Sequence, residues 1–97
     1  MYDDIPSFIK EFLLYMQNIK NRSKSTIREY HYDLRDTFRF LKLYKLDKIK
    51  FNNINDELIE KTNISDLNTN FVKKIELIDL YEYLNYLPFL SYSYLKF

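Results

Sequence analysis

Residues 23–41 read SKSTIREYHYDLRDTFRFL, a stretch that begins with hydroxyl side chains and continues with apolar residues at helical spacing. Serine is a favoured N-cap, so a helix is expected to start at Ser23 or Ser25. Steps of three or four residues between apolar positions are typical of an amphipathic helix. These positions are Ile27, Tyr30, Leu34, Phe38 and Leu41. We therefore predict one long helix that ends near residue 44 or 45 and packs along this apolar line.

The polar side of this predicted helix separates its charges when successive residues are placed about 100° apart. One flank carries cations and an aromatic ring: Lys24, Arg28, Tyr32, Arg35, Arg39 and Lys42. Ser25 and Thr26 add hydroxyl groups at the N-terminal end of this flank. The carboxylates of Glu29, Asp33 and Asp36 lie on the other side. Guanidinium forks and hydroxyl donors are groups that bind phosphate. An ordinary solvated helix surface gives the same charge pattern, so the pattern alone leaves both interpretations open.

Further helices are predicted on both sides of this stretch. Residues 4–20 have helical apolar spacing, with Asp4 as a candidate cap and Pro6 in the first turn. Residues 46–75 are rich in Asn, Asp and Thr and are expected to form mainly a loop, with short helical turns at residues 54–61 or 64–75. Residues 78–87 form the last predicted helix, which Pro88 should end. Its expected inner face consists of Leu80, Tyr81, Leu84 and Leu87.

Composition excludes several classes of site. The 97 residues fit one domain and contain no Cys and no Gly, which excludes disulfides, thiolate metal sites and Gly-rich phosphate loops. The single histidine, His31, cannot build a multi-His metal site and is expected at the surface or its boundary. No apolar run reaches the roughly 20 residues of a membrane span, and the N-terminus lacks the order of a signal peptide. We therefore expect a cytoplasmic protein with no cofactor, no membrane partner and no small-molecule substrate.

Charge differs between the two halves of the chain. Residues 1–50 hold 11 Lys and Arg against 7 Asp and Glu, a balance of +4, whereas residues 51–97 hold 4 against 7, a balance of −3. Such asymmetry indicates an anionic partner, although weakly.

Two motifs in the basic half have a recognisable form. The first, P-x-F-I-x-x-F-L-x-Y, is matched by Pro6, Phe8, Ile9, Phe12, Leu13 and Tyr15. The second, S-x-x-T-I-x-x-Y-x-x-D-L-x-x-F-x-x-F-L, is matched by residues 23–41, with Thr37 in place of the first Phe. In this order they resemble the N-terminal core-binding domain of Xer-like tyrosine recombinases and phage integrases. The predicted last helix resembles the next helix of that family, with Glu76 and Ile78 where the family usually has Thr and Ser.

The resemblance implies a small all-α, SAM-like orthogonal bundle over residues 1–87, with an incomplete last helix and an apolar tail at residues 88–97. In the family this bundle clamps one face of double-stranded DNA. The positions implicated in DNA binding by the resemblance are Lys24, Ser25, Thr26, Arg28 and Tyr32, with Arg35 and Arg39 as weaker backbone contacts.

The family's separate catalytic domain has no counterpart in these 97 residues. We therefore expect a truncated, non-catalytic DNA-binding module, with a full-length recombinase or a second copy of the chain as further partners. Two alternatives remain open at this point. One is a helical protein-interaction module that uses the apolar tail and the aromatic-rich last helix. The other is a decayed integrase fragment.

Overall fold

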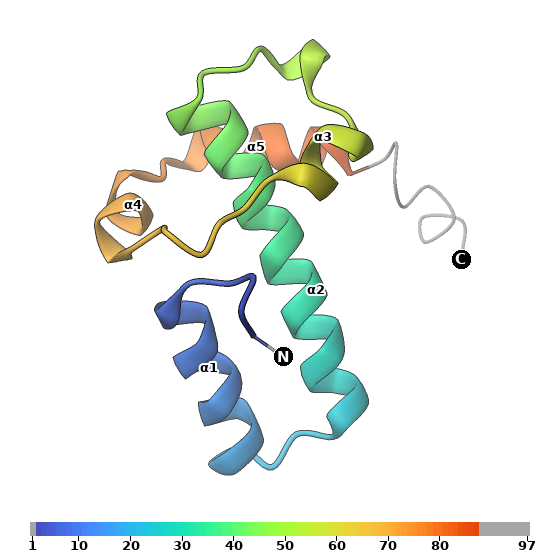
Figure 1. Cartoon of the computed structure of the whole chain (residues 1–97), viewed down its shortest axis with the longest axis vertical. Helices are drawn as coiled ribbons and strands as arrows, with labels where there is room; N and C mark the ends of the chain where they lie inside the picture. Colours follow the sequence, from blue (N-terminus) through green and yellow to red (C-terminus); the bar gives the residue numbers. More distant parts are fainter. Residues whose placement is uncertain (1, 88–97) are drawn as a thin grey trace.

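A computed structural model describes residues 2–87 as a set of helices joined by short loops (Figure 1). In chain order these are α1 (Ser7–Asn18), α2 (Lys24–Leu41), the π-helical turn η1 (Lys42–Leu46), the 3-10 turn η2 (Phe51–Asn53), α3 (Asp56–Lys61), α4 (Thr69–Lys74) and α5 (Leu77–Tyr86). No strand occurs among residues 2–87. The predicted all-α bundle is therefore confirmed. The expected tail at residues 88–97 lies outside the described residues.

Helix α2 starts directly after Ser23, one of the two predicted capping residues. The Ser23 hydroxyl oxygen accepts the backbone N–H of Thr26 at 3.2 Å, which satisfies one of the unpaired donors of the first turn. The helical run continues through η1 to Leu46, close to the predicted end. Asp4, in contrast, does not cap α1, because Pro6 takes the N-cap position. That prediction was wrong, and the Asp4 carboxylate pairs with side chains of α2 instead.

Asparagine and aspartate side chains start the later helices. Asn55 accepts the backbone N–H of Leu58 at 2.8 Å at the start of α3, and Asn68 caps α4 in the same way. The segment predicted to be mainly loop therefore contains both of its expected short helices. At the start of α5, the backbone N–H of Glu76 donates to Asp79 Oδ2 at 2.8 Å. Glu76 at the N-cap and Asp79 at the third helical position thus form a capping box, although the usual Thr and Ser of the resembled family are missing.

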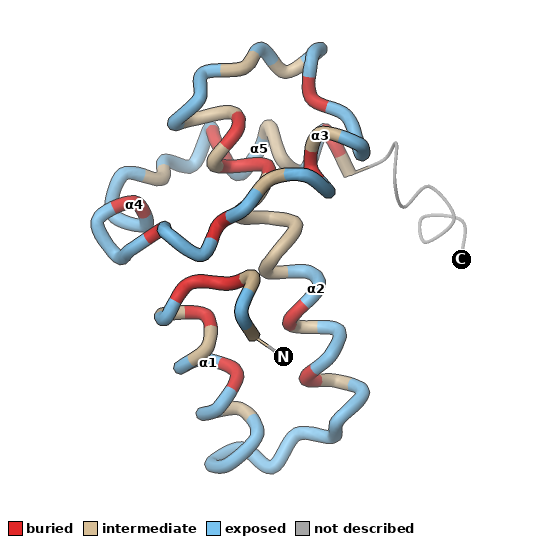
Figure 2. Tube along the Cα trace, in the orientation of Figure 1, coloured by how far each residue is buried: buried red, intermediate tan, exposed pale blue. Residues whose placement is uncertain are grey.

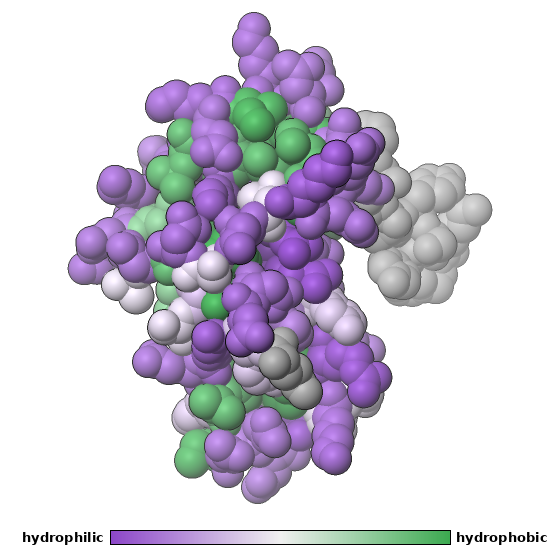
Figure 3. All heavy atoms as spheres, in the orientation of Figure 1, coloured by the Kyte–Doolittle hydropathy of each residue, from purple (hydrophilic) through white to green (hydrophobic). Residues whose placement is uncertain are grey.

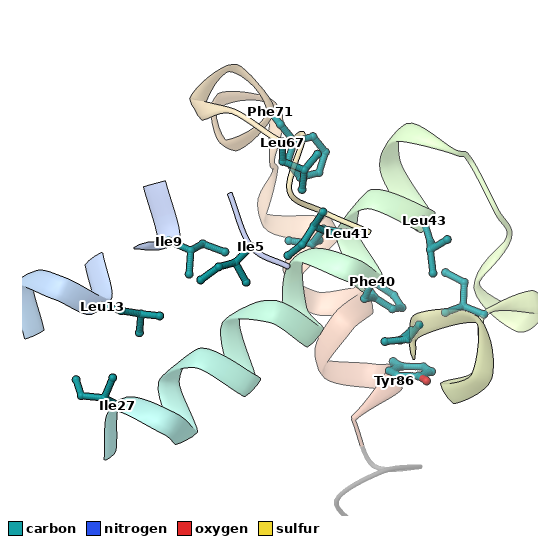
Figure 4. Close-up of a cluster of buried hydrophobic side chains, with 13 residues drawn as sticks. Ile5, Ile9, Leu13, Ile27, Phe40, Leu41, Leu43, Leu67, Phe71 and Tyr86 are labelled. Carbon is teal, nitrogen blue, oxygen red and sulfur yellow. The ribbon is translucent and has the colours of Figure 1, made fainter. Parts of the chain in front are cut away.

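Helix α2 is the axis of the core (Figures 1 and 2). Helix α1 packs on its N-terminal half, while α3 and α5 pack on its C-terminal half. The close-up in Figure 4 shows Ile9, Leu13 and Ile27 near the first contact, and Phe40 with Leu43 and Tyr86 near the second. Phe40 is fully buried, and its ring lies 5.3–5.7 Å from those of Tyr44, Tyr83 and Tyr86. The C-terminal half of α2 therefore holds an aromatic core.

The predicted inner face of α5 was wrong. Leu80, Tyr81 and Leu84 are 40–55% exposed, whereas Asp79 and Tyr86 are buried. Both buried residues have polar partners: the Tyr86 hydroxyl donates to Asp56 Oδ1 while its ring packs on Phe40. Asp79 pairs with Lys45 Nζ at 2.9 Å. Helix α5 has apolar residues on more than one side, so its helical spacing does not determine which side is buried. The pairs that Tyr86 and Asp79 form with distant residues determine it instead.

The surface view in Figure 3 is mostly hydrophilic, with apolar side chains gathered near the two ends of the long axis. Across residues 2–87, the longest helices are too short or too polar to cross a bilayer.

Candidate nucleic-acid interface

The first turns of α2 lie at one end of the molecule, away from α3 and α5 (Figure 1). Lys24, Ser25, Arg28 and Tyr32 are exposed there, and Thr26 is half-buried. The side chains of Lys24 and Arg28 form no hydrogen bond or ion pair with any residue between 2 and 87. These two cations are therefore available to an anionic ligand.

Three hydroxyl groups at the start of α2 are linked in series. Ser23 Oγ donates to Thr26 Oγ1 at 2.9 Å and lies 3.2 Å from Ser25 Oγ. Since Ser23 has one hydroxyl proton and gives it to Thr26, Ser25 must be the donor in the second contact. The proton of Thr26 Oγ1 then remains for an acceptor outside the helix. Ser25, which is exposed, and Thr26, which is half-buried, therefore add hydroxyl groups to this helix start.

A hollow of about 610 Å³ lies beside these turns, between α2 and the residues that precede α1. Its lining includes Lys24, Arg28, Tyr32 and Arg35, all of which were predicted, and also Arg22, which was not. Arg22 lies in the loop before α2, so a helical projection does not place it on the flank. The only signal for it in the sequence is its position directly before the capping serine.

The carboxylate of Asp4 closes one side of the hollow. Its Oδ1 lies 3.3 Å from His31 Nε2, and its Oδ2 lies 3.4 Å from Arg35 Nη1. Partial burial acts to raise the pKa of Asp4, but hydrogen bonds from His31, its own backbone N–H and Arg35 outweigh it and hold this pKa below the ordinary value. His31, expected at the surface or its boundary, is buried at 8% exposure in this cluster.

Tyr32 organises the same cluster from the helix side. Its ring stacks on His31, with centroids 5.4 Å apart and planes at 25°. The guanidinium carbon of Arg35 lies 5.0 Å from the centre of the Tyr32 ring, a cation–π contact. The ring of Tyr2 forms a T-shaped contact with His31, with centroids 5.1 Å apart. Tyr32 thus orients two of the groups that line the hollow.

The cations at the C-terminal end of α2 and the start of η1 have partners or are covered. Lys42 Nζ donates to Asn63 O at 2.6 Å and pairs with Asp66 at 3.1 Å. Arg39 is only 12% exposed, and its Nη1 lies 3.7 Å from Asp36 Oδ1. Desolvation and the neighbouring Arg35 lower the pKa of Arg39, and its buried Nε has no hydrogen-bond partner in the described part of the chain. The structure therefore gathers the other predicted residues around the start of α2 and the hollow, but places Arg39 apart from them.

Comparison with known proteins agrees with this architecture. Residues 9–84 match the family model of the phage integrase, N-terminal SAM-like domain. Over 82 residues the chain is 35% identical to tyrosine recombinase XerC of Caldanaerobacter subterraneus subsp. tengcongensis. This alignment covers 84% of the chain but 22% of that relative, and it matches its N-terminal region. No solved structure matches. The chain belongs to the family of phage integrase N-terminal SAM-like domains.

Proposed function

We propose that this chain is a non-catalytic module that binds double-stranded DNA through the N-terminal half of α2. The proposed process in which it takes part is DNA integration and recombination. The observation that carries the proposal is a pair of exposed cations, Lys24 and Arg28, which have no ion-pair partner among the described residues and lie beside the hydroxyl groups of the helix start. Family membership supplies the biological context.

The groups at this site suit the DNA backbone better than base edges. Arg28 can grip a phosphate with two N–H groups, and Lys24 adds a point charge. The first backbone N–H groups of α2 and the positive end of its dipole favour an anion in the same place. Phosphate contacts fix position without reading sequence. The module is therefore expected to bind with high salt sensitivity and little sequence preference, beside a full-length recombinase or a second copy on the same duplex.

The proposal is tested by fluorescence anisotropy of a labelled duplex of about 30 base pairs at about 50 mM and about 200 mM salt. Arg28→Ala should weaken binding and reduce the salt slope by about 0.9, the value for one lost phosphate contact. The matched control is Lys50→Ala, which removes one exposed positive charge from the loop at the opposite end of α2. No binding at the lower salt concentration, or equal losses in the two variants, would contradict the proposed interface.

A further inference from the structure

The Asp4 carboxylate is held in the way that two oxygens of a phosphate can be held. One of its oxygens faces His31 Nε2 at 3.3 Å, and the other faces Arg35 Nη1 at 3.4 Å. An imidazole and a guanidinium at these separations form a fork for a two-oxygen anion. The carboxylate that fills this fork comes from residues preceding α1, 27 and 31 positions away in sequence.

The fork is built to keep its shape without Asp4. His31 is held by a T-shaped contact with Tyr2 and by stacking on Tyr32. Arg35 is held by Tyr32 at 5.0 Å and by Asp36, whose Oδ1 lies 3.4 Å from Arg35 Nε. The side chain of Asp4 is 37% exposed, whereas those of His31 and Arg35 are 10% and 24% exposed. Asp4 is thus the solvent-facing group of the three, and a ligand entering the hollow meets it first.

Asp4 can also leave without disturbing the core. The next two residues, Ile5 and Pro6, are almost fully buried and anchor the start of α1. Rotation of the Asp4 side chain is enough to move the carboxylate away, so Tyr2 can keep its contact with His31. Arg22, Lys24 and Arg28 line the same hollow and concentrate phosphate near it.

We propose that His31 and Arg35 form a second phosphate-binding subsite for the DNA backbone, in which the Asp4 carboxylate lies until a phosphodiester displaces it. This inference rests on the proposed function and adds a built-in competitor to it. Asp4 reduces affinity for DNA by occupying a site that DNA would otherwise use.

The test compares Asp4→Asn with Asp3→Asn in the same anisotropy assay. Asp3 is exposed, lines the hollow and has no ion pair or hydrogen bond to any residue that the structure describes. Both variants remove one negative charge from the same segment, but only Asp4→Asn removes the charge that pairs with His31 and Arg35, so a phosphodiester displaces its neutral side chain more easily. Asp4→Asn should bind about fivefold more tightly at low salt, with a salt slope steeper by about 0.9. Asp3→Asn should change affinity less than about twofold.

Coupling to Arg35 gives the second measurement. Arg35→Ala should change DNA affinity less than about twofold in the wild-type background, because Asp4 already pairs with this cation. In the Asp4→Asn background it should remove the gain and restore the wild-type slope. Equal effects of Asp4→Asn and Asp3→Asn, or of Arg35→Ala in both backgrounds, would overturn the subsite. If Asp4→Asn lowers the melting temperature, Asp4→Ser replaces it in the test and should show the same gain in DNA affinity and in salt slope.

The failure of the subsite and the failure of DNA binding give different results. If the wild-type chain binds DNA and Arg28→Ala weakens it, but Asp4→Asn behaves as Asp3→Asn, the interface stands and the subsite falls. If no variant binds DNA, titration of Asp4→Asn with inorganic pyrophosphate tests the fork by itself. Shifts of the His31 imidazole signals in the NMR spectrum would support the subsite, and unchanged signals would overturn it.

Discussion

The N-terminal half of α2 leaves Lys24 and Arg28 in solvent, whereas the C-terminal half covers Arg39, and Lys42 at the start of the adjoining η1 pairs with Asp66. The two halves belong to one uninterrupted helix and carry the same kinds of side chain on the same flank. What differs is the set of neighbouring helices: α1 alone lies against the first half, and both α3 and α5 lie against the second. A cationic flank is therefore a candidate binding surface only where the fold leaves it uncovered.

Phe40→Ala should give the largest effect, because it breaks the packing of the C-terminal half. Phe40 is fully buried among aromatic rings, so the substitution should lower the free energy of unfolding by about 3–5 kcal/mol. Tyr32→Ala is the matched change in the other half, where the ring is 45% exposed, and should cost less than about 1 kcal/mol. Urea denaturation followed by circular dichroism measures both. Similar losses would show that the two halves are equally packed.

Asp79→Asn should lower the free energy of unfolding by about 2 kcal/mol at neutral pH, because it weakens a buried cap of α5. Burial acts to raise the pKa of Asp79, but the Glu76 backbone N–H and Lys45 outweigh it and hold this pKa below the ordinary value. A depressed folded-state pKa gives stability that is present above the unfolded-state value, about 3.9, and is lost as pH falls through the folded-state pKa. The difference between wild type and variant should therefore shrink as pH falls below about 4.

Asp33→Asn is the control for Asp79→Asn, because the pKa of Asp33 is shifted in the opposite direction. Desolvation, with Asp36 and Glu29 nearby, raises the pKa of Asp33, so its ionised form opposes folding at neutral pH. This variant should be at least as stable as wild type at pH 7. Parallel stability curves for wild type and Asp79→Asn across the acid range would contradict the assigned role of Asp79.

Arg39→Ala should separate stability from binding. Its side chain is 12% exposed, so its loss should cost about 1 kcal/mol of folding free energy through lost packing of the aliphatic stem. The salt slope for DNA should not change. Arg28→Ala should show the reverse: stability within about 0.5 kcal/mol of wild type and a reduced slope. A reduced salt slope in Arg39→Ala would indicate that Arg39 contacts DNA after all.

Lys48→Gly should give the smallest change in stability. Lys48 lies in the loop that follows η1. Lys48 has a φ of 54°, in the left-handed region that costs a residue with a Cβ about 1–2 kcal/mol. Glycine removes this strain but gains freedom in the unfolded chain, leaving a net stabilisation of about 0.5 kcal/mol. Lys50→Gly, where φ is −62°, has no strain to relieve and should destabilise. Thermal melts of both variants give the comparison.

The sequence predicts most of this fold because its signals are local. The capping of α2 by Ser23 and the spacing from Ile27 to Leu41 each depend on residues within one helix. The buried face of α5 depends instead on Asp56 and Lys45, which lie 30 and 34 positions before their partners, and no helical projection contains them. Which cations of the flank are paired depends in the same way on distant residues such as Asp4 and Asp66. Composition also gave no reason to bury His31, whose partner lies in the segment before α1.

The position of α2 between two packing groups has a consequence for folding kinetics. Helix α1 reaches α2 across the short connection that ends at Ser23, whereas α5 must return to α2 from the far side of residues 42–76. Closing the longer loop costs about 1–2 kcal/mol more entropy. The α1–α2 hairpin is therefore expected to form early in the transition state, and the aromatic cluster around Phe40 to consolidate later. The surface proposed for DNA would then be shaped before the half of α2 that it does not use.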